Sequence, residues 1–166
     1  GTPTSELIFN MAGGIRDDNK LKAFIPGGSS ANILTADKVD VPYDYEAIAE
    51  AGSMLGSGAL IVMDHTVNIV EAALRMTYFY MHESCGKCTP CREGTRWMYQ
   101  ILSDIQDGKG SNKQIEKLED ICDNMSFKCF CALGDAAVAP VASSIMHFRS
   151  DYDELIKKME DGAVTA

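Results

Sequence analysis

Three cysteines stand at regular spacing in the middle of the chain. Cys85, Cys88 and Cys91 are each separated from the next by two residues, within residues 83–94 (ESCGKCTPCREG). Thiolates at this spacing can bind three irons of a cubane iron–sulfur cluster from one loop, and the fourth iron then needs a ligand from elsewhere in the chain. A zinc site more often uses two separated Cys-x2-Cys pairs. The spacing therefore favours an iron–sulfur cluster over zinc, and both over cysteines that are buried by chance.

Three further cysteines are candidates for the fourth ligand. Cys122 falls on the apolar face of an expected helix, together with Leu118 and Ile121, which favours a buried structural thiol. Cys129 and Cys131 lie in a loop that enters another expected helix. Residue types and spacing favour neither of these two, so the fourth ligand is expected near position 130.

Two cations stand beside the thiols. Cys91 and Arg92 fall at the start of an expected helix, whose N–H groups and positive dipole end suit an anionic cluster. Lys87 and Arg92 add positive charge, and charge and hydrogen bonds near a cluster tune its reduction potential. We therefore consider both cations candidate cofactor-binding residues, with ordinary surface charge as an equally good explanation.

Composition narrows the class of protein. The chain has 166 residues, of which 46% are hydrophobic, and its net charge is −9 from 15 basic and 24 acidic residues. An acidic chain is a poor partner for nucleic acid or for anionic lipid. The sequence shows neither an apolar run of the roughly 18–20 residues that a membrane helix needs nor a signal-peptide pattern. The cysteines are therefore expected in a reducing compartment, where clustered thiols indicate metal or redox ligands.

Two kinds of pattern divide the chain near residue 64. The first part alternates short helices and strands between glycine-rich turns, which is typical of a small α+β unit. Its expected helices cover residues 6–12, capped by Thr4 or Ser5, and 45–51. Its expected strands cover residues 21–25 and 59–63, the second of them buried.

The second part follows a helical period. Thr66, Asn112 and Asp135 are expected to cap helices, and another helix, over residues 93–107, is expected to bury Trp97 on its apolar face. About four helices with short connections predict an up-and-down bundle. A loosely attached final helix is expected over residues 151–159.

These residues resemble a known family. Residues 83–94 and the later Cys131-Ala132-Leu133-Gly134-Asp135 are similar to the NADH-binding flavoprotein subunit of respiratory complex I, an NADH:quinone oxidoreductase. Residues 13–16, 23–30 and 51–58 resemble its ubiquitin-like SLBB domain. The resemblance implies an α+β protein: a β-grasp SLBB domain over residues 1–64, a four-helix-bundle [4Fe-4S] domain over 65–150, and a C-terminal helix or tail over 151–166.

The resemblance also selects ligands. In the family, the cysteine before Ala-Leu-Gly-Asp is the fourth ligand, which implies a cluster on Cys85, Cys88, Cys91 and Cys131 and leaves Cys129 as an extra thiol. It further implies that single electrons pass from reduced FMN through this cluster to a neighbouring iron–sulfur subunit. The complex would lie on the cytoplasmic side of the bacterial inner membrane, or on the matrix side in mitochondria.

One departure from the family limits this expectation. The family's FMN- and NADH-binding domain precedes the SLBB domain, and this chain starts after it. Gly56-Ser57-Gly58 does not replace that domain, because it lacks the third glycine of a dinucleotide fingerprint and leads into a strand. FMN and NAD are therefore expected in the parent subunit, and this chain alone is not expected to be catalytic.

Two alternatives stay open from the sequence. The same module occurs in the diaphorase subunit of an NAD(P)-linked hydrogenase or formate dehydrogenase. A different class of protein, a zinc-stabilised interaction domain, would use the same cysteines without a redox role.

Overall fold

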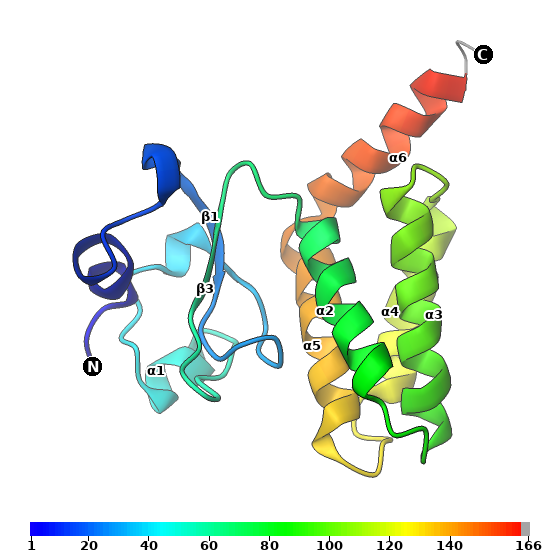
Figure 1. The fold of residues 1–166 in the computed structure, drawn as a ribbon, viewed down its shortest axis with the longest axis horizontal. Helices are drawn as coiled ribbons and strands as arrows, with labels where there is room; N and C mark the ends of the chain where they lie inside the picture. Colours follow the sequence, from blue (N-terminus) through cyan, green and yellow to red (C-terminus); the bar gives the residue numbers. More distant parts are fainter. Residues whose placement is uncertain (164–166) are drawn as a thin grey trace. The chain divides into compact units, whose positions relative to one another are not determined.

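A computed structural model describes the backbone of residues 1–163 and the side chains of residues 1–157. The chain has the α+β class expected, with helices and a small antiparallel sheet. It forms two compact units, Gly1–Val67 and a second that begins at Asn68 (Figure 1). No helix in the described residues combines the length and the apolar character needed to cross a membrane.

The sheet of the first unit has three antiparallel strands in the order β2-β1-β3, formed by β1 (Leu21–Ile25), β2 (Leu34–Thr35) and β3 (Ile61–Asp64). The predicted strand over residues 21–25 is confirmed. The prediction of a buried second strand was wrong, because β3 lies at an edge and Ile61 and Val62 are 39% and 38% exposed. Met63 is buried, so its side chain points from this strand into the core.

Short helices accompany this sheet. They comprise Glu6–Met11, which has π-type geometry, single turns at Arg16–Asp18 and Ala36–Lys38, and helix α1 at Tyr45–Glu50. The Asp44 carboxylate caps α1 by accepting from the Ala47 N–H at 2.9 Å. The predicted caps of the first helix were wrong. Ser5 is itself helical, and the Thr4 hydroxyl donates to the Val41 carbonyl at 2.9 Å instead.

The second unit is helical. Its helices are α2 (Ile69–Glu83), α3 (Thr89–Gln106), α4 (Asn112–Met125), α5 (Ala132–His147) and α6 (Arg149–Ala163). Helices α2 and α4 each pack against both α3 and α5 (Figure 1). Their apolar faces form one core that includes Val70, Met98, Leu102, Ile115, Leu118 and Val141.

The predicted starts of three helices need correction. The Asn68 side chain caps α2 by accepting from the N–H groups of Val70 and Glu71, whereas the Thr66 hydroxyl donates to Asp64. The residue before α4 is Ser111, one position before the predicted cap Asn112. Helix α5 begins at Ala132, which leaves Asp135 inside the helix. The starts of α2 and α4 each contain several residues that can serve as caps, and α5 begins after a cysteine, so residue type alone does not locate these starts.

Trp97 was also placed wrongly from the sequence. It lies at the edge of the apolar stripe of α3 and is 52% exposed, whereas Met98, Leu102 and Ile105 are buried. A residue at the margin of a helical stripe is buried only if a neighbouring helix covers it, and the packing of α2 and α4 on α3 leaves Trp97 partly in solvent.

The first turns of helix α6 are firmly attached, which contradicts the prediction of a loose final helix. Tyr152 is completely buried, and its hydroxyl forms a hydrogen bond of 2.7 Å with the Ser144 hydroxyl of α5. The buried Asp151 carboxylate accepts from the Ile69 N–H at 2.9 Å, at the first turn of α2. Helix α6 therefore supplies both core area and a cap for α2.

Candidate functional site

Five of the six cysteines line one cavity of the helical unit. The cavity has a volume of about 160 Å³, and the thiols that line it are Cys85, Cys88, Cys91, Cys129 and Cys131. The other lining residues are Glu83, Ser84, Lys87, Phe130, Leu133 and Gly134. The structure thus brings together all four predicted ligands and the extra thiol.

Two helix starts position these thiols. Cys88 immediately precedes α3 and Cys91 lies in its first turn, with a proline at the start of the helix as the local geometry favours. Cys131 immediately precedes α5, in an extended conformation. Helices α2 and α4 end at Glu83 and Met125, just before the two cysteine-bearing loops. Free N–H groups at two helix N-termini therefore lie at the edge of the cavity, where they favour negative charge.

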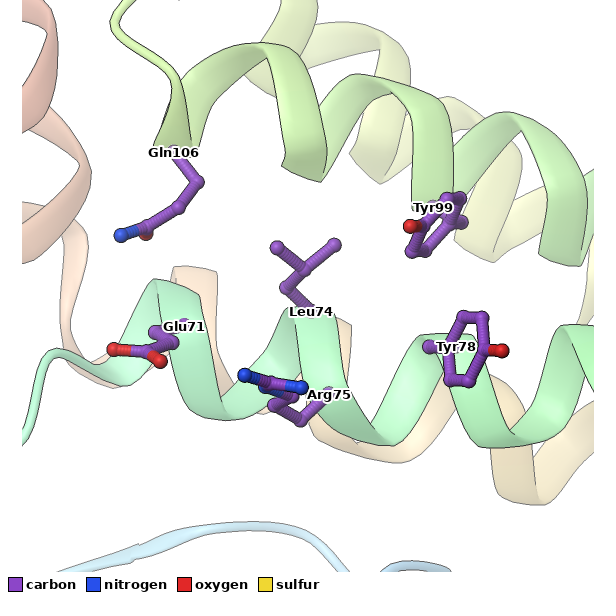
Figure 2. A pocket seen from close by; sticks show the side chains of 6 residues that line it. All are labelled: Glu71, Leu74, Arg75, Tyr78, Tyr99 and Gln106. Atoms are coloured by element: carbon purple, nitrogen blue, oxygen red, sulfur yellow. The ribbon is translucent and has the colours of Figure 1, made fainter.

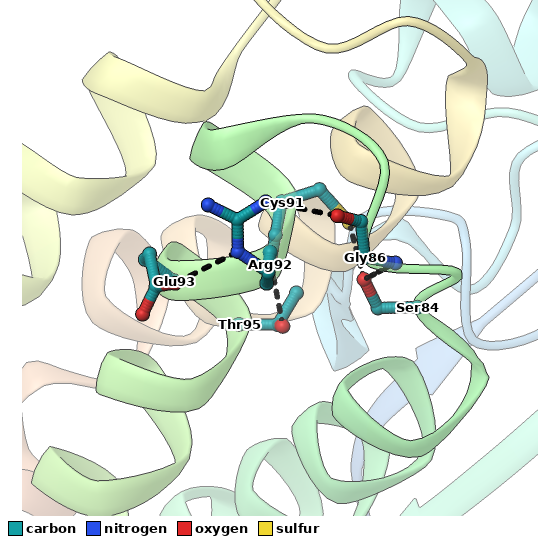
Figure 3. A network of polar contacts seen from close by, with 6 residues as sticks. All are labelled: Ser84, Gly86, Cys91, Arg92, Glu93 and Thr95. Atoms are coloured by element: carbon teal, nitrogen blue, oxygen red, sulfur yellow. Dashed lines mark hydrogen bonds and ion pairs between the residues drawn. The ribbon is translucent and has the colours of Figure 1, made fainter.

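Cys91 is the buried member of the set, only 5% exposed. Its sulfur lies 3.2 Å from the Ser84 hydroxyl, within hydrogen-bond distance (Figure 3). Burial raises the pKa of the Cys91 thiol, and the nearby thiols of Cys88, Cys131 and Cys85 raise it further, while the Ser84 hydrogen bond opposes them. The effect of three other thiols on Cys91 is consistent with the lining of one cavity by all four residues.

Cys88 and Cys129 line the same cavity, and each affects the pKa of the other. A hydrogen bond from the Phe130 backbone N–H lowers the pKa of Cys88, and a hydrogen bond from the Cys129 side chain lowers it further. Burial raises the pKa of Cys129 to about 11, and the charge of Cys88 adds to the effect. Cys88 is therefore the more readily ionised thiol of this pair, and Cys129 holds its proton.

The predicted cations differ in their positions. Lys87 lines the cavity. Arg92 instead braces the loop that carries the first two thiols: its Nη1 donates to the Gly86 carbonyl at 2.9 Å, and its Nε pairs with Glu93 at 2.9 Å (Figure 3). Arg92 thus stabilises the conformation of the loop by binding the loop's backbone. The sequence did not indicate this role.

Cys122 lies in the core of the helical unit, as predicted for a structural thiol. It is 3% exposed, and its sulfur lies 3.8 Å from the sulfur of Met98. Burial raises the pKa of Cys122 to about 12, which keeps the thiol neutral.

Asp135 fastens the loop that carries Cys129 and Cys131. Its carboxylate accepts from the Phe127 N–H at 2.6 Å, across eight residues. Phe127 has a φ of 56°, a left-handed conformation that costs free energy in a residue with a side chain. The sequence suggested a helix cap here, and no local pattern indicated that the carboxylate instead reaches back to the start of the loop.

Replacing Asp135 by alanine is expected to lower the free energy of unfolding of the helical unit by about 1.5 kcal/mol, because the charge-assisted hydrogen bond to the strained Phe127 is lost. Urea titrations followed by the fluorescence of Trp97, the single tryptophan, measure this change. Asp135→Asn retains an acceptor and serves as the matched control. Equal stability of Asp135→Ala and the unaltered chain would contradict the proposed anchoring role.

A second hollow lies between α2 and α3, with a volume of about 520 Å³ (Figure 2). It is lined by Glu71, Leu74, Arg75, Tyr78, Tyr99 and Gln106. The Gln106 Oε1 atom is buried and lacks a hydrogen-bond partner within the described residues. None of the predicted ligands lines this hollow, so the chemistry expected from the sequence belongs to the cysteine cavity.

The donor set of the cysteine cavity suits an iron–sulfur cluster. No three His, Cys, Asp or Glu side chains in the described part of the chain converge closely enough to hold a single metal ion. In an iron–sulfur cluster each thiolate binds a different iron, so the sulfurs surround a volume instead of meeting at one point. Five cysteines that line one small, largely apolar cavity are compatible with that requirement.

Known proteins share this region. The sequence model of the NADH-ubiquinone oxidoreductase-F iron-sulfur binding region matches residues 71–155, which is just over half of the chain. The F subunit of NADH-quinone oxidoreductase from Streptomyces coelicolor is 52% identical over 153 residues, covering 92% of this chain and 34% of the relative. The corresponding protein of Rickettsia typhi is 44% identical over 158 residues, covering 95% of this chain and 38% of the relative.

Solved structures share the fold. An NAD+-reducing [NiFe]-hydrogenase in its H2-reduced state superposes with a TM-score of 0.78 at 26% identity, over 90% of this chain and 25% of that chain. The chain spans little more than a third of the length of the two NADH-quinone oxidoreductase relatives. The matched region is an iron–sulfur binding region, which confirms the expected cofactor, a [4Fe-4S] cluster. By the extent of this match, the chain belongs to the NADH-ubiquinone oxidoreductase-F iron-sulfur binding family.

Proposed function

We propose that this chain is an electron-transfer module of an NADH:quinone oxidoreductase, in which Cys85, Cys88, Cys91 and Cys131 bind the [4Fe-4S] cluster. The observation that carries the proposal is the convergence of these thiols on one cavity in a member of this family. When bound, such a cluster supplies reversible one-electron redox chemistry.

The choice of Cys131 over Cys129 rests on the family resemblance of Cys131-Ala132-Leu133-Gly134-Asp135. Two features of the site are consistent with it. Cys131 immediately precedes α5, and its charge acts on Cys91. Burial raises the pKa of the Cys129 thiol to about 11, which disfavours the thiolate that a ligand must supply.

Neighbouring donors stabilise the negative charge of the proposed ligands. The Phe130 backbone N–H lowers the pKa of Cys88, and the Ser84 hydroxyl can donate to the Cys91 sulfur. Such hydrogen bonds orient ligands and set the reduction potential of a bound cluster. Lys87, at the rim of the cavity, adds positive charge.

The parent protein supplies the remaining parts in this proposal. An FMN- and NADH-binding domain of the same subunit provides the electrons, so this chain alone does not oxidise NADH. The first unit, with its antiparallel sheet and α1, serves as the SLBB domain of a β-grasp fold. The complex lies on the cytoplasmic side of the bacterial inner membrane, or on the matrix side in mitochondria.

Exposed aromatic side chains beside the cavity support a docking surface for the neighbouring iron–sulfur subunit. Phe127 and Phe130 are 93% and 82% exposed, and Phe130 also lines the cavity. Large apolar side chains exposed together in a loop are typical of interaction sites. A partner that docks there comes close to the cluster site.

Iron and acid-labile sulfide counts on the anaerobically purified chain test the proposal. We expect about four of each per chain, and an EPR signal after reduction with dithionite. Fewer than about two irons per chain would contradict the electron-transfer function. Stoichiometric zinc in a colourless, folded protein would instead identify a zinc-stabilised interaction domain.

A second candidate is the same module in the diaphorase subunit of an NAD(P)-linked hydrogenase. The structural similarity to the NAD+-reducing [NiFe]-hydrogenase favours it, although the identity is only 26%. Neighbouring genes distinguish the two: genes for many membrane subunits indicate the quinone oxidoreductase, and a gene for a hydrogenase large subunit indicates the alternative.

A further inference from the structure

Gly134 is a buried glycine in the first turn of α5, three residues after Cys131. Its φ is not positive, so the backbone at this position would accept any L-residue. Within a helix, glycine is less favourable than alanine, because it loses more backbone freedom on folding. Local structure therefore gives no reason for a glycine at position 134, and the reason must lie in the residues that pack against it.

A side chain at position 134 would touch both cysteine-bearing segments. A Cβ atom added there would overlap the Cys129 sulfur, lie 2.6 Å from the Cys129 Cβ and lie 3.8 Å from the Cys91 Cβ. Rotation about χ1 can move the Cys129 sulfur away, but the Cβ atom is attached to the backbone and moves only with it. Because carbon atoms pack at about 3.5–4.0 Å, the backbone at Cys129 would have to shift by roughly 1 Å.

The loop of residues 127–131 is anchored at both ends, so a shift at Cys129 reaches its neighbours. At the first end, the Phe127 N–H donates to the Asp135 carboxylate at 2.6 Å. At the other end, Cys131 directly precedes α5. Only two residues separate Cys129 from Cys131 along the chain, so a displacement of Cys129 is passed on to the residue that must reach the cavity.

We propose that Gly134 is a positioning residue for the fourth ligand. Because it lacks a side chain, the loop of residues 127–131 can lie close enough to Cys91 for Cys131 to bind the cluster. The inference rests on the proposed function, in which Cys131 is the ligand of the fourth iron. It also explains the position of the extra thiol: the Cys129 side chain fills the space that the glycine leaves open.

The test is a count of iron and acid-labile sulfide in the full chain, with EPR spectra after reduction with dithionite. In Gly134→Ala we expect iron to fall from about four to about three or fewer per chain, with an altered EPR spectrum. Circular dichroism is expected to show unchanged helix content, since alanine favours the helix. In the double variant with Gly134→Ala and Cys129→Gly, both overlapping atoms of residue 129 are absent. The iron content and the spectrum are therefore expected to return to those of the unaltered chain.

Gly94→Ala is the matched control, because Gly94 is a buried glycine within α3. A Cβ atom added there would meet the Sδ and Cγ atoms of Met125, whose long and flexible side chain can move without its backbone. The single variant Cys129→Gly is the second control, since it removes a side chain without crowding the loop. Both controls are expected to retain about four irons per chain.

Several results would overturn the inference. About four irons and an unchanged spectrum in Gly134→Ala show that a side chain at this position does not disturb the ligands. Loss of iron that the double variant does not restore shows that the contact with Cys129 is not the cause. Loss of helix content together with iron makes Gly134 a folding residue, and equal loss of iron in Gly94→Ala shows that position 134 is not special. An unaltered chain that binds no iron refutes the proposed function itself, which the metal count reveals before any variant is compared.

Discussion

Replacing Cys131 by serine is expected to remove or convert the cluster, whereas replacing Cys129 by serine leaves about four irons per chain. Cys131 supplies the thiolate for the fourth iron in the proposed ligand set, and a serine hydroxyl is a poor substitute for a soft thiolate. Cys129 is outside the proposed ligand set, so its loss is expected to spare the metal content. Iron and sulfide counts and the EPR spectrum of the dithionite-reduced chain measure both outcomes.

The two variants control for each other. The same substitution is made two residues apart in one loop, and both thiols line the same cavity. Cys131 is exposed and Cys129 half-buried, so neither change should unfold the helices, which circular dichroism can check. Equal loss of iron in both variants, or loss in Cys129→Ser alone, would contradict the assignment of the fourth ligand.

Replacing Tyr152 by alanine is expected to lower the free energy of unfolding of the helical unit by about 3–5 kcal/mol, the usual cost of removing a buried aromatic ring. The Tyr152 ring is completely buried in the core shared with α2–α5, and its hydroxyl is bonded to Ser144. Anaerobic urea titrations followed by Trp97 fluorescence measure the loss, because Trp97 lies in α3 of the same unit.

Two comparison variants separate the contributions of Tyr152. Tyr152→Phe keeps the ring and removes only the hydrogen bond to Ser144, for an expected cost of about 1 kcal/mol. Met146→Ala changes a side chain that is 74% exposed on α5, and its effect should stay within about 0.5 kcal/mol. If Tyr152→Ala were no more destabilising than Met146→Ala, helix α6 would not be part of the core.

Local patterns in the sequence predicted much of this fold. The helical period located α2–α5, and a short apolar segment located β1. The errors arose where the burial of a residue depends on a second helix or strand. The exposure of Ile61 and Val62 depends on the position of β3 at the sheet edge, and the exposure of Trp97 depends on which helices cover α3. A single sequence shows the spacing of apolar residues on one face of a helix or strand. It does not show which neighbouring element covers that face.

The C-terminal helix illustrates the same limit. From the sequence, a loosely attached helix was expected over residues 151–159. Asp151 nevertheless caps α2 through the Ile69 N–H, across 82 residues of sequence, and Tyr152 enters the core. Contacts between residues so far apart in the sequence form only when the intervening helices have packed against one another.

By itself, the sequence determined the three-thiol loop of Cys85, Cys88 and Cys91, because two-residue spacing is a local property of the chain. Only the tertiary structure brought the loop between α4 and α5 against that motif, placing Cys129 and Cys131 in the same cavity and leaving room for Cys129 at Gly134. The reason is physical: ligands within one loop need only short-range backbone geometry, whereas a second loop reaches the same cavity only through the packing of the four helices that carry both loops.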